Sequence, residues 1–205
     1  RPSFFIDDGV PVDLTPTFAR PDFELYVAAE QAAARNGVAL FDQSSYAKLR
    51  VRGPDAERLL QRLCANDMSV APGRVIYTGM LNVNGGYESD CTVFRHAMDD
   101  YLIVTGTAQS VRDRDWITRN LHDEQVVIDD VTEGIAVLAL AGPKARDLLA
   151  AGSDSELSNT AFPYMSWRDI VVGRWSARAA RLSYVCELGW ELYMPSGFAV
   201  AVYDM

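Results

Sequence analysis

Two distant stretches of the chain share one pattern, and this repeat constrains the fold more than any other feature. Residues 49–60 read LRVRGPDAERLL and residues 138–149 read LALAGPKARDLL. Each combines an apolar strand, a Gly-Pro break and a helix with proline in its first turn. The Gly-Pro, an Ala and a Leu pair stand at equal offsets, which predicts an internal duplication, at about residues 47–125 and 134–195. The spacing is far longer than a solenoid repeat, so we expect two similar, pseudo-symmetric α+β subdomains.

Hydrophobic periodicity outlines the elements around this repeat. Residues 1–20 lack periodicity and are expected to form an N-terminal arm or linker. A helix is predicted at 21–36, because Gly37 follows in the position that ends a helix. Further helices are predicted after Pro54 and Pro143, at 108–121 and from residue 196. Strands are predicted at 47–52, 74–82, 88–95, 101–105, 135–141, 167–175, 177–185 and 190–194. Strands joined by short turns, with single helices between them, predict an α+β fold of antiparallel sheets with packed helices.

The composition argues against several kinds of partner. A formal net charge of −9 disfavours nucleic acid and anionic membranes, which both need clustered cations. Three cysteines without a CxxC pair predict no metal site, and neither do the two histidines, which lack ligand spacing and which we expect to be surface or rim residues. Reduced thiols favour a cytoplasmic protein, and no apolar run reaches the roughly 18 residues of a membrane-spanning helix. We also expect a fragment of a longer chain, because residue 1 is Arg and residues 198–203 end inside an apolar periodic segment.

The stretch from Tyr77 to Cys91, YTGMLNVNGGYESDC, predicts a β-hairpin. Its Asn-Gly-Gly sequence at residues 84–86 tolerates the positive φ angles of a tight turn. Asp90 is unusual in the returning strand, because its short polar side chain competes with the ladder for backbone groups. This carboxylate therefore lies either on a solvated face or in a functional site that includes Tyr77.

A second stretch that combines acids with aromatic residues runs from Tyr184 to Glu191. Read as a regular strand, it places one face at Tyr184, Cys186, Leu188 and Trp190. A bulge or turn at Gly189 would redirect Glu191. The plain structural interpretation of these acids is a solvated Asp and an amphipathic sheet edge. If they are functional, carboxylates flanked by tyrosines suit a flat, nitrogen-rich heterocycle, either a pterin or a purine. A carboxylate accepts two parallel N–H bonds from such a ring, and aromatic faces cover its plane.

Several motifs, in one order over about residues 38–195, resemble the folate-binding aminomethyltransferase family, which includes the T-protein of the glycine cleavage system. The motif residues are Leu40 to Ser45, Gly53 to Ala56, Ala65-Asn66-Asp67, Tyr77-Thr78, Leu81-Asn82, Gly85-Gly86, Ser89-Asp90, and Tyr184 to Glu191 in the form Y-x-x-E-x-G-x-E. The resemblance implies a T-protein-like folate-binding domain over residues 21–205 and a C-terminal β-barrel domain beyond Met205.

Within this family the chain is most similar to the tetrahydrofolate domain of flavin-dependent sarcosine and dimethylglycine dehydrogenases. Ser45 to Lys48 stands where the T-protein usually has His-Met-Gly, and Val104 to Ala108 replaces its Val-Val-Asn-Ala. The resemblance implies tetrahydrofolate as cofactor, FAD only on a missing upstream domain, an amine-derived one-carbon donor, and 5,10-methylenetetrahydrofolate as product. The alternatives are a glycine cleavage aminomethyltransferase and a folate-binding module without turnover.

The family also implies roles for four positions in this chain. Asp90 corresponds to the catalytic aspartate near the reacting nitrogen of tetrahydrofolate, where it would accept a proton or stabilise a developing cation. Glu191 corresponds to the acid that binds the pterin edge. Tyr77 and Tyr184 correspond to the aromatic residues that line the pterin slot.

Overall fold

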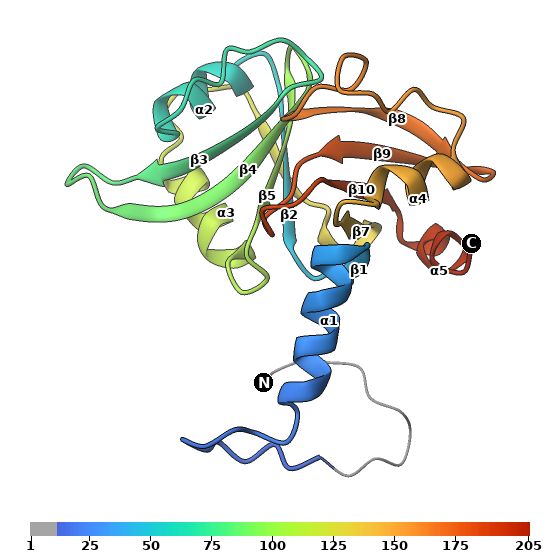
Figure 1. Ribbon diagram of the computed structural model, residues 1–205. Coiled ribbons are helices and arrows are strands. Elements are labelled where there is room, and N and C mark those ends of the chain that lie inside the picture. The colour runs from blue at the N-terminus through green and yellow to red at the C-terminus, as the bar shows by residue number, and fades with distance from the viewer. Residues whose placement is uncertain (1–11) are drawn as a thin grey trace.

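Two five-stranded antiparallel sheets lie side by side and form the body of the protein (Figure 1). The structure, a computed structural model, describes residues 12–205, so the first part of the predicted arm lies outside it. Residues 12–20 contain no helix or strand. In spatial order the N-terminal sheet consists of β3 (Val75–Leu81), β4 (Tyr87–Ala97), β5 (Asp100–Thr105), β2 (Ala47–Arg52) and β6 (Val127–Asp130). The C-terminal sheet consists of β8 (Ser166–Val172), β9 (Trp175–Arg181), β10 (Gly189–Pro195), β7 (Ile135–Ala141) and β1 (Ala39–Asp42).

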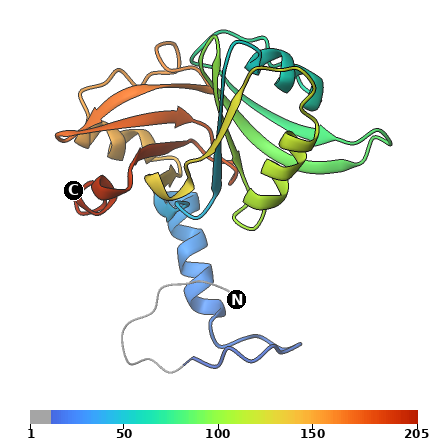
Figure 2. The same ribbon diagram turned by 180° about the vertical axis from the view of Figure 1, so that it is seen from behind.

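The helices are short, apart from the first. They are α1 (Glu24–Asn36), α2 (Ala56–Leu63), α3 (Ser110–Arg119), α4 (Ala145–Gly152) and α5 (Ala199–Tyr203), with 3-10 turns η1 (Thr132–Gly134) and η2 (Ser196–Phe198). Figures 1 and 2 both show α1 extending away from the two sheets, and none of its residues is buried. Within residues 12–205, no helix has the length and apolar character needed to cross a membrane.

Both sheets follow the same path through space. In each, an outer hairpin (β3–β4 or β8–β9) leads to a middle strand (β5 or β10) and then to the strand of the repeated motif (β2 or β7). The last strand is exchanged between the halves: β1 precedes the first copy but pairs with β7, and β6 precedes the second copy but pairs with β2. The predicted fold class, α+β with two pseudo-repeated subdomains of antiparallel sheet, is confirmed.

The glycine of each Gly-Pro break lies against the segment that enters an exchanged strand. Gly53 has φ 142° and Gly142 has φ 136°, a region that residues with a Cβ rarely adopt. A Cβ at Gly53 would lie 2.2 Å from the carbonyl oxygen of Gln125, and one at Gly142 would lie 2.4 Å from that of Gly37. Both glycines therefore permit the close approach of the segments that lead into β6 and β1.

The segments that follow the exchanged strands also bind the repeated strands in the same way. After β1, Ser44 Oγ accepts a hydrogen bond from the backbone N–H of Val137 in β7, at 3.0 Å. After β6, Thr132 Oγ1 accepts one from the backbone N–H of Lys48 in β2, at 2.9 Å. Val137 and Lys48 occupy matching positions in the two repeats. The pseudo-symmetry thus extends to individual hydrogen bonds.

Lys48 differs from its counterpart Val137 in carrying a charge into the interior. It is fully buried, and its Nζ donates to the carbonyl oxygens of Tyr46 at 2.7 Å, Ser44 at 2.9 Å and Thr132 at 3.4 Å. Burial lowers the pKa of the ammonium group. This side chain binds both crossover segments at once, since Ser44 follows β1 and Thr132 follows β6.

Each sheet packs against its own helices, and a third apolar cluster lies between the sheets. Leu59 of α2 and Ile117 of α3 belong to the cluster of the N-terminal sheet, and Leu149 of α4 belongs to that of the C-terminal sheet. Between the sheets, the rings of Phe94 in β4 and Tyr193 in β10 meet edge to face with centroids 5.0 Å apart. This shared core joins the two subdomains into one unit.

His96 lies at the edge of this junction and is partly buried, in keeping with the expected surface or rim position. Its ring centroid is 4.8 Å from that of Trp167 in β8, and Arg178 Nη1 of β9 lies 3.0 Å from both of its ring nitrogens. Arg178 also stacks over Trp167 at 4.2 Å and pairs with Asp169 at 3.1 Å. Burial, and then the charge of Arg178, lower the pKa of His96 to about 4.

Three local features differ from, or refine, the predicted elements. The hairpin turn falls at residues 82–86 with Gly85 at φ 77°, as the Asn-Gly-Gly sequence predicts. β6 was not predicted, because its four residues include two acids and pair only with β2. Residues 182–188 form a loop instead of continuing a strand, and Cys186 in this loop has φ 58°. The predicted alternation of side chains from Tyr184 onward is therefore wrong.

Candidate functional site

The β3–β4 hairpin brings Tyr77 and Asp90 together on one face. Tyr77 pairs with Thr92 and Gly79 pairs with Asp90 across the ladder, so Tyr77 and Asp90 are diagonal neighbours. The Tyr77 hydroxyl donates to Asp90 Oδ2 at 3.1 Å. This hydrogen bond, and then the charge of Asp90, raise the pKa of Tyr77. Both side chains reach solvent, so a ligand has access to the carboxylate.

Tyr184 reaches the same place from the loop between β9 and β10. Its ring meets that of Tyr77 edge to face, with centroids 6.0 Å apart and planes inclined by 68°. Its hydroxyl lies 2.5 Å from Thr92 Oγ1 on β4. Burial raises the pKa of Tyr184 to about 12, although more than half of the residue's surface is exposed. The Tyr184 hydroxyl is thus held by Thr92, while much of the residue remains accessible.

Glu191 lies in the buried strand β10. It is 5% exposed, and its Oε2 accepts a hydrogen bond from the Tyr193 hydroxyl at 2.5 Å. Burial raises the pKa of Glu191, and the bond from Tyr193 acts in the opposite direction. The charge of Glu191 in turn helps to raise the pKa of Tyr184, which places the two side chains in one electrostatic environment.

The two tyrosines do not form a slot that could hold a ring between them. A flat ring between two aromatic faces needs a separation of about 7 Å, twice the contact distance of carbon atoms, and parallel faces. Tyr77 and Tyr184 stand 6.0 Å apart and inclined by 68°. A flat ligand would therefore lie against an outer face of the pair, beside the hydroxyl groups rather than between the rings.

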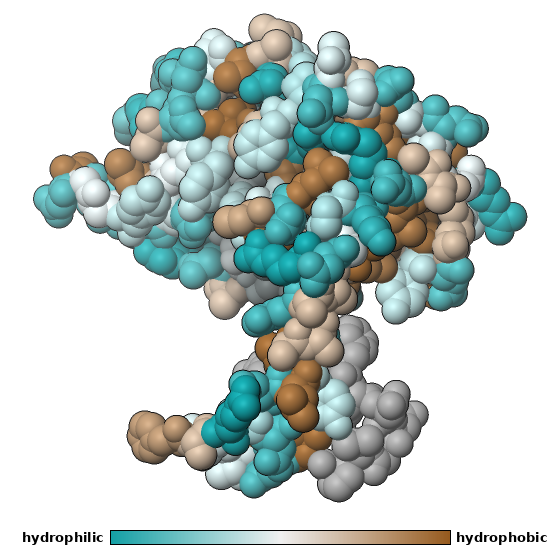
Figure 3. Space-filling view, viewed as in Figure 1, coloured by the Kyte–Doolittle hydropathy of each residue, from teal (hydrophilic) through white to brown (hydrophobic). Residues whose placement is uncertain are grey.

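A hollow of about 420 Å³ opens beside Asp90. Its lining consists of Tyr77, Tyr87, Glu88, Ser89, Asp90, Gln109 and Arg112. Tyr184 and Glu191 do not line it, so of the four predicted site residues only Tyr77 and Asp90 border the hollow. Figure 3 shows hydrophobic and hydrophilic side chains mixed on the face that carries the β3–β4 hairpin.

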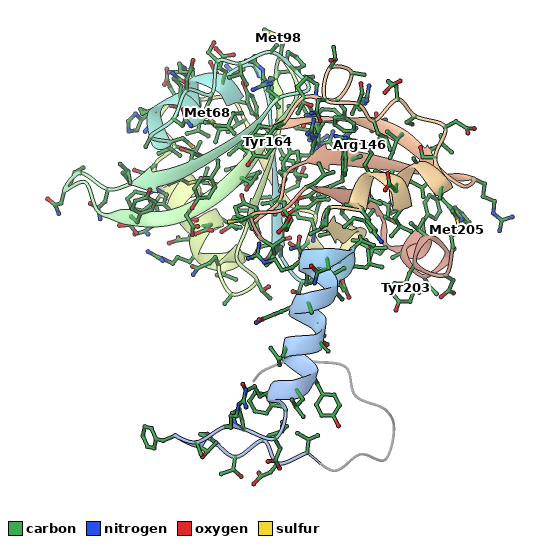
Figure 4. The ribbon with its side chains drawn as sticks, viewed as in Figure 1. Met68, Met98, Arg146, Tyr164, Tyr203 and Met205 are labelled. Carbon is green, nitrogen blue, oxygen red and sulfur yellow. The ribbon has the colours of Figure 1, made fainter. Side chains whose placement is uncertain are left out.

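Sequence reasoning missed three residues around this site. Thr92 and Tyr193 follow Asp90 and Glu191 at a spacing of two residues, and the strand period would have placed them on the same faces. Tyr164, which the sequence does not mark, is exposed and influences the pKa of Tyr184. Figure 4 shows Tyr164 where the two sheets meet, far from Tyr203 on α5.

Metal and thiol chemistry have little support in the part of the chain that the structure describes. Within residues 12–205, no group of three His, Cys, Asp or Glu side chains is arranged to hold a metal ion. Cys64 and Cys91 are free and buried, and Cys186 is free and exposed.

The fold is that of a known aminomethyltransferase. The crystal structure of glycine cleavage system aminomethyltransferase T from Bartonella henselae matches with a TM-score of 0.77, covering 98% of this chain and 52% of that chain. The sequence identity is 24%, so this likeness concerns the fold alone.

Sequence comparison gives the family. The family model described as "GCVT N-terminal domain" matches residues 1–205, and the chain belongs to this family. The chain is 36% identical to mitochondrial sarcosine dehydrogenase of Homo sapiens, over 91% of its length and 22% of that protein. It is 35% identical to the aminomethyltransferase of Caldanaerobacter subterraneus, over 87% of its length and 48% of that protein. The predicted resemblance is confirmed: this is an aminomethyltransferase-type domain related to both proteins.

Proposed function

We propose that the chain transfers a one-carbon unit to tetrahydrofolate as the folate domain of an FAD-dependent sarcosine or dimethylglycine dehydrogenase. The contact of Tyr77 with Asp90, beside Tyr184 and close to Glu191, is the observation that carries this proposal. It joins an accessible carboxylate, two aromatic rings and a buried acid at one place. FAD would belong to an upstream domain, and the one-carbon donor would be derived from an amine.

The residues present fit a reduced pterin. Glu191 is a buried carboxyl group, and a carboxylate accepts two parallel N–H bonds from an amidine-like ring edge. Burial disfavours the charged form of Glu191 and so raises its pKa. N–H donors of a bound ligand would stabilise that charged form and offset the cost of burying it. Tyr77 and Tyr184 expose ring faces against which a flat heterocycle packs. Tyr193 holds the carboxyl group in position through Oε2.

Asp90 is suited to a different task, since its carboxylate is exposed and, within residues 12–205, accepts a hydrogen bond only from the phenol of Tyr77. Tetrahydrofolate, when bound, supplies the nucleophilic nitrogen that takes up the one-carbon unit, giving 5,10-methylenetetrahydrofolate. Asp90 would accept the proton released at that nitrogen or stabilise positive charge that develops nearby. Tyr77 would hold Asp90 Oδ2 in place and leave Oδ1 for this work.

A glycine cleavage aminomethyltransferase is the second candidate, because the chain is almost equally similar to such an enzyme. The two candidates share the folate site and differ in the donor, which is an iminium from amine oxidation in one and a lipoyl-bound aminomethyl group in the other. Product formation from sarcosine or dimethylglycine, compared with formation from an aminomethyl-lipoyl carrier, distinguishes them.

The test of the folate site compares two acids with a control. Calorimetric titration with folinic acid should show binding that Glu191→Ala weakens strongly and that Asp90→Ala changes by less than about tenfold, the effect of one modest contact. Asp204→Ala, which removes an exposed carboxylate at the end of α5, should leave binding unchanged. Unchanged affinity in Glu191→Ala would remove Glu191 from the pterin site.

The catalytic role of Asp90 is tested separately, in the flavin-containing protein that the proposal assumes. Asp90→Ala should abolish formation of 5,10-methylenetetrahydrofolate while amine oxidation by the flavin continues. Full product formation in this variant would show that Asp90 has no part in the transfer.

A further inference from the structure

We propose that the hollow beside Asp90 is the subsite for the one-carbon donor and binds it as a methylated ammonium or iminium cation. This inference rests on the proposed function and names the part of the site that the second reactant occupies. The hollow has about 420 Å³, more than a small alkylammonium group fills. It also shares Tyr77 with the aromatic pair, so its occupant would lie next to a pterin held against that pair.

Two tyrosine rings form walls of the hollow. Tyr87 begins β4, and its ring lies over Gly79 of the neighbouring strand. A Cβ at Gly79 would be 2.3 Å from Tyr87 Cε1 and 2.8 Å from Cζ, so this ring position exists only because residue 79 has no side chain. Tyr77 and Tyr87 are 48% and 67% exposed, which leaves ring surface free for a ligand. Aromatic faces attract alkylammonium cations through the ring quadrupole.

The charges around the hollow leave Asp90 without a cation. Arg112 Nη2 lies 3.0 Å from Glu88 Oε2, and Asn82 Nδ2 donates to Glu88 Oε1 at 2.9 Å, so the charge of Glu88 is already matched. Asp90 accepts a hydrogen bond from the neutral phenol of Tyr77 and, within residues 12–205, forms no ion pair. One carboxylate at the wall thus lacks a counter-charge, which a bound cation would supply.

A further carboxyl group, that of Asp113, lies buried behind the lining of the hollow. Ser89 lines the hollow, and its Oγ donates to Asp113 Oδ2 at 2.8 Å. Thr105 Oγ1 donates to the same oxygen at 2.7 Å. Asp113 is 1% exposed, and its Oδ1 has no hydrogen-bond partner among the described residues. A carboxyl group behind the lining makes the hollow more favourable for a cation than for an anion.

A matched pair of ligands tests the charge preference on the full 205-residue chain. Choline carries a trimethylammonium group, and 3,3-dimethylbutan-1-ol has the same shape without the charge. Titration followed by NMR shifts at β3 and β4 should show choline binding at least about tenfold more tightly than the alcohol, as expected when cation–π attraction and a carboxylate act together. Equal affinities, or no binding of choline to the unmodified chain, would overturn the proposal.

Variants test the walls. Tyr87→Leu should weaken choline binding by about fivefold or more, whereas Tyr87→Phe, which keeps the ring, should stay within about twofold. Tyr203→Leu is the matched control, because Tyr203 is similarly exposed but lies on α5, away from the hollow. Gly79→Ala keeps both tyrosines but displaces the Tyr87 ring, so it should reproduce the loss, with thermal unfolding confirming that the variant folds. Retained binding in both Tyr87→Leu and folded Gly79→Ala would contradict the assignment.

Titration with folinic acid separates this inference from the proposed function. Tyr87→Leu should leave folinic acid affinity within about threefold, since Tyr87 lines the hollow, which neither Tyr184 nor Glu191 borders. If Tyr87→Leu weakened folinic acid and not choline, the hollow would belong to the folate, and the donor subsite would be wrong while the proposed function stood. If the chain bound choline but not folinic acid, the proposed function would fail and the cation site would remain.

Discussion

The β3–β4 hairpin of the N-terminal half and the β8–β9 hairpin of the C-terminal half occupy matching places in their sheets. They differ in length, since β4 has 11 residues and β9 has 7. The extra length of β4 carries Tyr87 and Asp90 beyond the residues that pair with β5, and Tyr77 on β3 bonds Asp90. The C-terminal half contributes Tyr184 from a loop and Glu191 from β10 instead. The repeated framework holds the two sheets together, and the site consists of residues at which the halves depart from their common pattern.

The two halves of the framework share residues at positions where the backbone geometry requires them. Gly53 and Gly142 meet the same requirement for positive φ and close approach in both halves. Ser44 and Thr132 make equivalent hydrogen bonds to the repeated strands. These positions are constrained by the backbone, whereas surface positions of the hairpins are free to diverge.

The largest expected effect tests whether the two glycines are equivalent. Gly53→Ala and Gly142→Ala should each lower the free energy of unfolding by about 4 kcal/mol, because an unfavourable φ is combined with a backbone clash. Urea denaturation measures the loss. Gly197→Ala is the control, since its added Cβ meets nothing within 4 Å. Tolerance at one glycine but not at the other would break the structural equivalence of the halves.

The junction between the halves should be sensitive to pH through His96. Its pKa is lowered from 6.5 to about 4, so folding favours the neutral ring. Stability is complete above pH 6.5 and falls as the pH drops toward 4, by on the order of 3 kcal/mol, since each tenfold change in acidity corresponds to about 1.4 kcal/mol.

Urea denaturation between pH 7 and pH 4 measures this effect as the difference between the unmodified chain and His96→Phe. The subtraction removes contributions of Asp100, Asp169 and other carboxylates that both chains share. If the free energy of unfolding changed with pH in the same way for both chains, protonation of His96 would have no effect on the stability of the junction.

A smaller effect is expected where the repeats differ at one matching position. Lys48→Met should lower the free energy of unfolding by about 2 kcal/mol, because buried carbonyl groups of both crossover segments lose their donor while the cost of burying a charge is removed. Val137→Met at the matching position is the comparison for the change in side-chain volume. A stabilised Lys48→Met variant would show that the buried charge costs more than its hydrogen bonds contribute.

Much of the architecture could be predicted because it follows from patterns of residues that are close together in the sequence. The Gly-Pro repeat indicated the two subdomains, and the Asn-Gly-Gly sequence placed the hairpin turn at Gly85. Period-two alternation gave most of the strands. β6 escaped prediction because a strand of four residues with two acids depends on its partner β2 rather than on its own sequence.

The candidate site, too, could be predicted only in part. The sequence by itself determined the repeat, the hairpin and the residue types at positions 77, 90, 184 and 191, since these follow from short-range pattern and motif order. Only the tertiary structure decided that Tyr77 and Tyr184 meet edge to face, that the hydroxyls of Tyr184 and Thr92 meet, and that Tyr87 rests on Gly79. These contacts join residues that are distant in sequence or lie on neighbouring strands, and their geometry depends on register, loop conformation and the exchange of β1 and β6. Periodicity along one strand carries no information about those variables.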